Sequence, residues 1–128
     1  MNFLTTKNVL TVIGGIALLE GIGFFFGAEG ITKGAFGSLN QGDALRVGTL
    51  MHEALGGLMA CFGIVVLSAR NIEISAAKKI LNGVGIGYLV FLAVALKHFT
   101  GGEAQPPIPA LVLVVVLSAL AFFTANKK

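Results

Sequence analysis

Four long runs of apolar residues constrain the fold of this chain more than any other feature. They extend from Val9 to Gly27, from Ala44 to Ala69, from Ala76 to Phe99, and from Ile108 to Ala125. A helix needs about 20 apolar residues to cross the hydrocarbon core of a bilayer, and each run is near that length or longer. The pattern therefore predicts an all-α, integral membrane four-helix bundle that forms a single transmembrane domain.

The composition excludes an ordinary water-soluble domain. Of the 128 residues, 55% are hydrophobic and 12% are charged, and the mean hydropathy is +0.90. Soluble domains carry about 25% charged residues, and a chain of this length cannot hide so much apolar surface from water. The net charge of +3 does not indicate nucleic-acid binding, because the basic residues punctuate the apolar runs and form no stripe.

The basic residues are divided unequally between the two sides of the predicted bundle. Lys33, Arg46 and Lys97 fall on one side. The other six fall on the side of the two termini, namely Lys7, Arg70, Lys78, Lys79, Lys127 and Lys128. Because basic residues concentrate on the cytoplasmic side of a membrane, both termini and the Arg70–Lys79 loop are predicted to be cytoplasmic.

Small residues indicate where these helices are expected to meet, because they let membrane helices approach closely. The second helix carries the longest such stripe, and the first and third carry one glycine pair each. The stripe is Gly48, His52, Gly56 and Ala60, and the pairs are Gly23 with Gly27 and Gly83 with Gly87. The fourth helix is bulky and nearly featureless, so it is expected to face lipid over much of its circumference. The glycine-rich segment from Ala28 to Asp43 is expected to form an outer loop.

Six ionisable residues lie in the outer half of the predicted spans: Glu20, Arg46, His52, Glu53, Lys97 and His98. Charge inside a membrane is costly and by default marks a functional site or an internal pair. We therefore expect an outward-opening pocket lined by Glu20, His52 and Glu53. His98 is a further candidate for this lining, and Arg46 and Lys97 are placed near its rim. Within this ligand-binding pocket, Glu53 is expected to pair with Arg46, and Glu20 to meet His52.

Each of these residues also has a purely structural interpretation, which the sequence leaves open. Arg46 and Lys97 can extend to the lipid headgroups with their stems in the apolar region. Glu20 and Glu53 can be neutral, or paired with Arg46 and Lys97 as structural ties. His52 can simply form a hydrogen bond to a neighbouring helix.

The sequence predicts no catalytic residue and no metal site. No spacing matches the Glu-x-x-His pairs of di-iron bundles, and His52 and His98 lie at unequal depths for two haem ligands. The single cysteine, Cys61, excludes an internal disulfide and any Cys-x-x-Cys pair. With no nucleophile–base pattern and no nucleotide fingerprint, the chain is not expected to act as an enzyme by itself.

The stretch from Arg46 to Ala60, RVGTLMHEALGGLMA, and the ending LSAR at Arg70 resemble the second helix of the DoxX-like superfamily of small four-helix bacterial membrane proteins. The resemblance covers mainly this helix. It implies a location in the bacterial cytoplasmic (inner) membrane and an accessory or small-molecule-binding role, since some members accompany quinone-linked oxidoreductases. It assigns no catalytic residue.

Two functional hypotheses of different classes follow. The first is an accessory or structural subunit of a larger membrane complex, or a homo-oligomer, with the bilayer and other membrane subunits or a second copy as partners. The second is a small carrier or binding protein whose polar pocket takes a proton, a quinone or a small amphiphile, so that quinone and lipid are the ligands considered. A carrier usually has broken helices or an inverted repeat, and their absence from the sequence favours the first hypothesis.

Overall fold

A computed structural model describes residues 4–36, 42–102 and 107–127, which are helical almost throughout. The α-helices are α1 (Thr6–Ala35), α2 (Gly42–Ser68), α3 (Ile74–Thr100) and α4 (Ile108–Asn126), and a short 3-10 helix, η1 (Ala69–Asn71), follows α2. All four α-helices are long and apolar enough to cross a membrane. The predicted four-helix architecture is therefore confirmed.

Local turn chemistry sets several helix ends. The Thr5 hydroxyl accepts a hydrogen bond from the Asn8 amide at 3.2 Å and caps the start of α1. Gly102, just after α3, has a φ of 71°, a left-handed conformation that glycine adopts without steric cost. Pro107 precedes α4 and Pro109 lies in its first turn, where the missing amide proton has no helical acceptor.

α1 continues to Ala35, although the sequence after Gly27 was expected to form a loop. Two contacts hold this glycine-rich extension in a helix. The ammonium of Lys33 and the carboxylate of Glu29, one turn apart, form an ion pair at 2.5 Å. The Thr32 side chain is buried against α2. Tertiary packing therefore outweighs the low helix propensity of the glycines.

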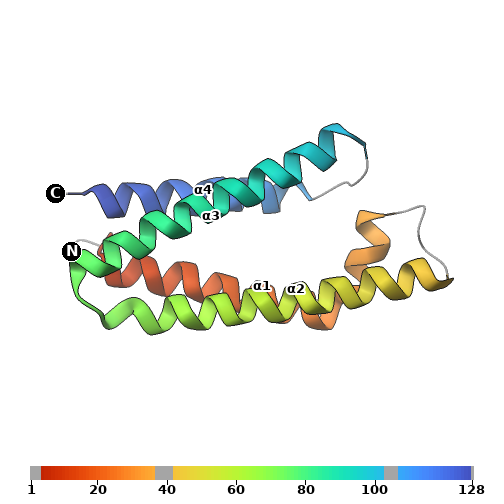
Figure 1. The fold of residues 1–128 in the computed structure, drawn as a ribbon, viewed down its shortest axis with the longest axis horizontal. Helices are drawn as coiled ribbons and strands as arrows, with labels where there is room; N and C mark the ends of the chain where they lie inside the picture. Colours follow the sequence, from red (N-terminus) through yellow and green to blue (C-terminus); the bar gives the residue numbers. More distant parts are fainter. Residues whose placement is uncertain (1–3, 37–41, 103–106, 128) are drawn as a thin grey trace.

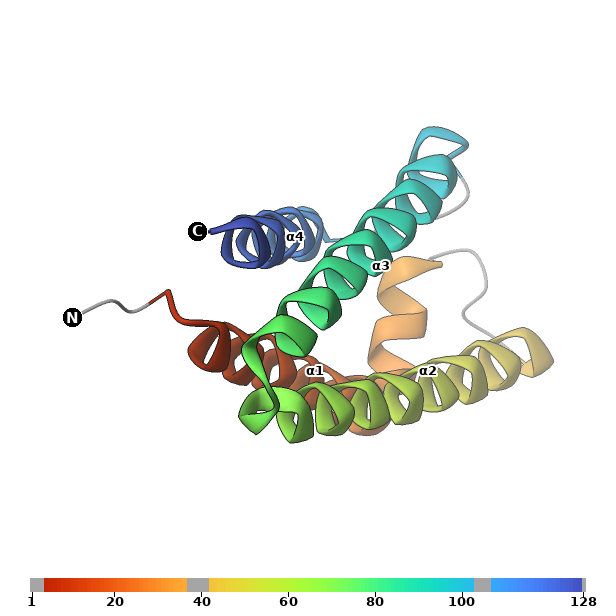
Figure 2. The ribbon, with the colours of Figure 1, turned by 60° about the vertical axis from the view of Figure 1, so that its left-hand side comes forward.

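The last part of α1 is turned out of line with its first part (Figures 1 and 2). The Thr32 hydroxyl donates a hydrogen bond to the carbonyl oxygen of Ala28 at 2.8 Å. This type of bond from a threonine to its own helix commonly bends the helix. Glycines on either side of the bend offer little side-chain packing to resist it.

The start of α1, the turn between α2 and α3 and the end of α4 lie at one end of the bundle (Figure 1). We call this the terminal end, and the other the opposite end. The described basic residues of the terminal end are Lys7, Arg70, Lys78, Lys79 and Lys127, and Lys128 lies outside the described residues. The terminal end therefore carries more of the described basic residues than the opposite end.

α1 and α2 form the most extensive contact in the molecule, and it is built on glycine. A Cβ atom added at Gly56 would lie 2.7 Å from the carbonyl oxygen of Gly21, and one added at Gly63 would lie 2.7 Å from that of Gly14. Real side-chain carbons do not approach backbone atoms so closely, so only glycine lets these two helices meet. The predicted stripe on α2 faces α1 and is confirmed.

The other predicted glycine pairs do not pack in this way. An added Cβ would meet open space at Gly23, Gly83 and Gly87, and at Gly27 it would meet only Ile31 of the same helix. α1 instead packs through Gly14 and Gly21, which are seven residues apart. Seven is the repeat that keeps one face of a helix against a supercoiled partner, so a four-residue glycine spacing alone selected the wrong face.

α4 packs against α3 through a different kind of contact. The buried Ser118 hydroxyl donates a hydrogen bond to the carbonyl oxygen of Gly85 at 3.0 Å, and Val114, Leu117 and Ala121 are buried beside it. The other side of α4 is exposed, including Val112, Val116 and Phe123, so much of its circumference is left open, as expected. A helix that is apolar all round gives no amphipathic signal, so its inward face cannot be recognised from hydrophobicity.

The two helix pairs meet near the terminal end and separate beyond it. All four helices contribute to a buried core there, including Leu10, Val66, Leu81 and Ala121. The backbones of α2 and α3 come close at few points, and α3 diverges from α1 and α2 toward the opposite end (Figures 1 and 2). The bundle is therefore two helical hairpins, α1–α2 and α3–α4, joined at one end.

Candidate functional site

A cavity of about 550 Å³ lies between the two hairpins. All four helices contribute to its walls, with Ala17 from α1, Leu58 from α2, Val84 from α3 and Val114 from α4 among the lining residues. The backbones of α2 and α3 lie apart at the cavity, and the rings of Phe62 and Tyr88 bridge the space between them. Its volume is within the range of about 300–1,000 Å³ that is typical of small-molecule sites.

Glu20 and Tyr88 are the only residues with strongly polar side chains among the described residues that line this cavity. Each follows the first residue of its helix by 14 positions, which places both about 21 Å from the terminal end at the helical rise of about 1.5 Å per residue. Glu20 is half-buried and interacts electrostatically with Tyr88. One carboxyl group and one phenol therefore share a depth near the middle of the bundle.

The hydroxyl oxygen of Tyr88 is buried and has no hydrogen-bond partner among the described residues. Leaving such a group without a partner costs about 1–3 kcal/mol. Tyr88 therefore places an unpartnered donor beside the cavity, and an acceptor that enters the cavity reaches it once the side chains covering the hydroxyl move.

Aromatic rings surround this donor. The ring of Phe62 meets that of Tyr88 edge to face, with centroids 6.4 Å apart and planes at 89°, a favourable arrangement for an aromatic pair. Phe24 and Phe91 also line the cavity. The site therefore suits a largely apolar molecule that carries a hydrogen-bond acceptor.

His52 lies outside this cavity, between α2 and α1. Its Nδ1 atom lies 2.9 Å from the Thr32 hydroxyl oxygen and 2.8 Å from the carbonyl oxygen of Gly48. Its ring is stacked with Phe24 at a centroid distance of 5.9 Å, and the ring of Phe36 lies 6.3 Å away. The hydrogen bond to a neighbouring helix that the structural interpretation of His52 requires is therefore present.

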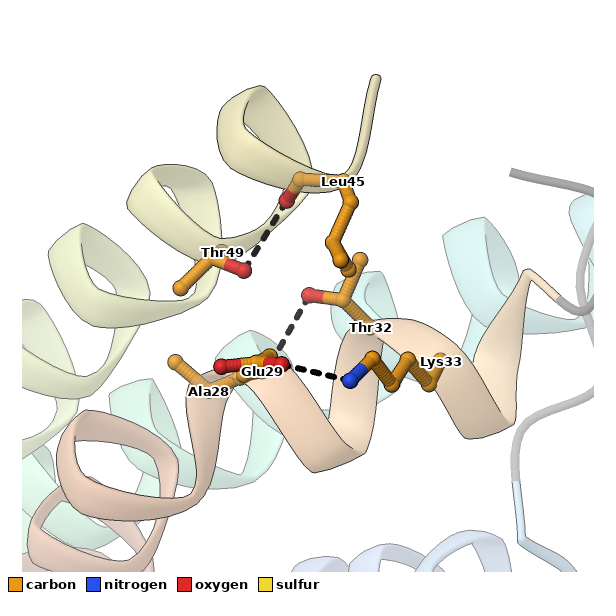
Figure 3. Close-up of polar contacts among 6 residues, drawn as sticks. All are labelled: Ala28, Glu29, Thr32, Lys33, Leu45 and Thr49. Atoms are coloured by element: carbon orange, nitrogen blue, oxygen red, sulfur yellow. Dashed lines mark hydrogen bonds and ion pairs between the residues drawn. The ribbon is translucent and has the colours of Figure 1, made fainter. Parts of the chain in front are cut away.

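The partners of Thr32 assign the tautomer of His52. The Thr32 hydroxyl donates its only proton to the carbonyl oxygen of Ala28 (Figure 3), so it accepts from His52, and the carbonyl of Gly48 can only accept. Nδ1 therefore carries the proton, and Nε2 presents a lone pair in the neutral ring. Figure 3 also shows the Glu29–Lys33 ion pair, which lies in the same turn of α1 as the bond from Thr32 to Ala28.

Arg46 and Glu53 do not form the predicted pair. Arg46 is exposed and Glu53 is half-buried, and no ion pair or hydrogen bond joins them in the described part of the chain. The hydroxyl of Thr49, which lies between them in the sequence, bonds to the Leu45 carbonyl of its own helix at 2.9 Å (Figure 3).

Lys97 and His98 lie in the last turn of α3, at the end that diverges from α1 and α2. Lys97 is exposed and His98 is half-buried. Neither is among the described residues that line the cavity. The divergence of α3 therefore separates both of them from the site containing Glu20.

The register of α1 against α2 explains why Glu20 and His52 do not meet. Residue numbers that face each other, as in Gly21 with Ala60 and Thr32 with Gly48, add up to 80 or 81. His52 therefore faces position 28 or 29 of α1, and Glu20 lies about 13 Å nearer the terminal end. The predicted contact between Glu20 and His52 is therefore wrong. The two residues do not share one pocket, because Glu20 lines the cavity and His52 lies outside it. The ligand-binding role of each residue stays a prediction.

Tyr88 is the residue that sequence reasoning missed. It is the only tyrosine in the chain. Because its ring is apolar, it does not stand out from the other residues of its hydrophobic run. A usable signal was present, because Glu20 and Tyr88 are equally far from the starts of α1 and α3, which run in the same direction in this topology.

Comparison of the chain with protein-family models, with curated proteins and with solved structures returned no match. The resemblance of α2 to the DoxX-like superfamily stays a prediction. Among the described residues, no group of three His, Cys, Asp or Glu side chains gathers in a way that suits a metal ion.

Proposed function

We propose that this chain is an integral membrane protein that binds a small amphiphile in the cavity between its hairpins, with the polar end of the ligand at Tyr88 and Glu20. The observation that carries this proposal is the unpartnered Tyr88 hydroxyl within an otherwise apolar, aromatic cavity. A ligand acceptor would remove the cost of that buried donor. A quinone has the required chemistry, because its carbonyl oxygens accept hydrogen bonds and its flat ring packs against aromatic side chains.

The single tyrosine provides a direct test. Because the chain has no tryptophan, its ultraviolet emission comes from Tyr88 alone. We expect a short-chain benzoquinone, added to the protein in phosphatidylcholine vesicles that contain no other protein, to quench this emission in a saturable manner. Quenching that rises linearly without saturation, as in free solution, would contradict a site at Tyr88.

The Tyr88→Phe variant tests the hydrogen bond itself. One such bond contributes about 0.5–1.5 kcal/mol, so equilibrium dialysis should show benzoquinone binding weakened by roughly threefold to tenfold. Binding of a saturated hydrocarbon of similar size should not change, because it makes no hydrogen bond. Equal losses for both ligands would mean that the variant has altered the cavity and not removed a specific contact.

We further propose that the terminal end is cytoplasmic, on the basis of its excess of basic residues. Cysteine labelling in a Cys61→Ala background tests this orientation. Gly34→Cys, near the opposite end and with open space around it, should react with an impermeant reagent added outside intact cells. Ser75→Cys, exposed in the first turn of α3, should react only after the cells are opened, and the reverse pattern would contradict the orientation.

A second candidate function is that of an accessory subunit, favoured by a separate observation. Gly23 and Gly57 have no neighbour within 4 Å of an added Cβ, so these small residues are not used for packing within the chain. Exposed glycines in membrane helices commonly receive another helix. Gly57→Leu should therefore abolish association with a partner or a second copy, measured by crosslinking in native membranes, while leaving the isolated chain folded.

A further inference from the structure

A second pocket, of about 280 Å³, lies at the terminal end. It is formed where the first turn of α1 meets η1 and the first turn of α3, and its lining includes Thr6, Arg70 and Ile74. This pocket is separate from the cavity between the hairpins and shares none of its described lining residues. It is at the edge of the apolar spans, where lipid headgroups lie.

The charge of this pocket is positive. Lys7 and Arg70 both line it, and no carboxylate is among its described lining residues. The nearest acidic residue in the sequence is Glu73, and its carboxylate accepts a hydrogen bond from the Ser75 hydroxyl at 2.7 Å. Two basic residues therefore line one small space whose described lining contains no carboxylate.

Two helix starts lie at this pocket. The amide groups of a first helical turn have no helical acceptor, and the dipole places partial positive charge there. Neither α1 nor α3 has an acidic residue in its first turn, and Glu73 does not cap α3 with its side chain. The Thr5 cap occupies the Asn8 amide, which leaves the amides of Thr6 and Lys7 without a helical partner. At α3 the Glu73 carboxylate, bonded to Ser75, already lies beside the first turn. The start of α1 and the two basic residues are therefore the groups that suit an anion.

We propose that this pocket binds the phosphate group of an anionic phospholipid. The phosphate would meet Lys7, Arg70 and the start of α1, which together match its charge and its acceptor oxygens. Ile72 and Ile74 also line the pocket and are exposed, so they are placed to contact the apolar part of a lipid. Basic pockets between membrane helices commonly bind anionic headgroups, and this assignment is independent of the proposed quinone-class site.

Lipid binding to the purified full chain in a neutral detergent provides the test, with bound lipid counted by native mass spectrometry. We expect phosphatidylglycerol to be retained more strongly than phosphatidylcholine. Arg70→Gln should weaken retention of phosphatidylglycerol by about fivefold or more, since one basic residue near a membrane surface contributes about 1 kcal/mol. Arg70→Lys should retain most of the binding, because it keeps the charge.

Lys79→Gln is the matched control, because Lys79 is an exposed basic residue of the same end that does not line the pocket. It should change retention less than about twofold. Equal weakening by Arg70→Gln and Lys79→Gln would overturn the proposal in favour of a diffuse positive field. Equal retention of the two lipids would overturn the requirement for a negative headgroup.

Sodium phosphate separates the two sources of a phosphate group. If the ligand is a lipid, millimolar inorganic phosphate should not displace phosphatidylglycerol, because it lacks the apolar contacts with Ile72 and Ile74. Displacement at low phosphate concentration would instead identify a site for a free anion and overturn the assignment to a lipid.

Discussion

The two hairpins solve the problem of helix packing in a membrane in different ways. In α1–α2, glycines bring backbone against backbone, as Gly56 against Gly21 shows. In α3–α4, a buried serine bonds across the interface and the ring of Phe122 covers Gly85. A backbone contact cannot yield to a larger residue, whereas the far end of a side chain can move. The first hairpin is therefore expected to act as the rigid scaffold, and the second as the adaptable wall of the cavity.

The largest effect that this comparison predicts is at Gly56. Gly56→Leu must separate α1 from α2, because an added Cβ already lies 2.7 Å from two backbone atoms, Gly21 O and Phe25 N. We expect a loss of more than about 3 kcal/mol in unfolding free energy, measured by denaturant titration in mixed micelles. Gly57→Leu is the matched control, since Gly57 has open space, and similar losses for the two neighbours would break the comparison.

A sharper test places the same small change in both hairpins. Gly21→Ala directs a methyl group at the backbone of Ala60, and Gly85→Ala directs one at the ring of Phe122 at 2.9 Å. We expect Gly21→Ala to cost roughly 2–3 kcal/mol and Gly85→Ala about 1 kcal/mol or less, because the ring can turn aside. Thermal unfolding of the two variants measures the difference. A larger loss for Gly85→Ala would reverse the assignment of rigid and adaptable hairpins.

The smallest predicted effect concerns the Ser118 hydrogen bond. Interhelical hydrogen bonds in membranes contribute about 0.6 kcal/mol on average, so Ser118→Ala should lower the unfolding free energy by roughly that amount. Ser68→Ala is the control, because the Ser68 hydroxyl bonds only within its own helix, to Ile64. A loss above about 2 kcal/mol for Ser118→Ala would show that the α3–α4 pair depends on this bond as strongly as α1–α2 depends on glycine.

The number of helices was predictable from the sequence because apolar runs report directly on membrane spans. The helix faces that pack against each other were not predictable in the same way. α2 presents a dense stripe of small residues, and its packing face was assigned correctly. Gly23 and Gly87 each belong to a glycine pair with four-residue spacing, which suggests packing, but both face open space. α4 is apolar on every side, so hydrophobicity does not distinguish the buried Val114 from its neighbours.

The candidate site was predictable only in part. Glu20 was identified because a carboxyl group in an apolar run is costly, and it does line the cavity. The predicted contact with His52 depended on the register of the antiparallel helices α1 and α2. In the observed register, His52 lies opposite a position of α1 that is eight or nine residues beyond Glu20. Tyr88 was missed because its significance comes from a hydroxyl without a partner, which only the packed arrangement shows.

The central claim, that the space between the rigid and the adaptable hairpin is a ligand site, can be tested by filling that space. Gly87 lines the cavity and Gly23 does not, and both have open space around an added Cβ. The deciding measurement is the dissociation constant of the benzoquinone, read from Tyr88 emission, for Gly87→Leu and Gly23→Leu. We predict that Gly87→Leu weakens binding about tenfold or more and that Gly23→Leu changes it less than about twofold. Unchanged binding by Gly87→Leu, or equal weakening by both, would contradict a ligand site between the hairpins.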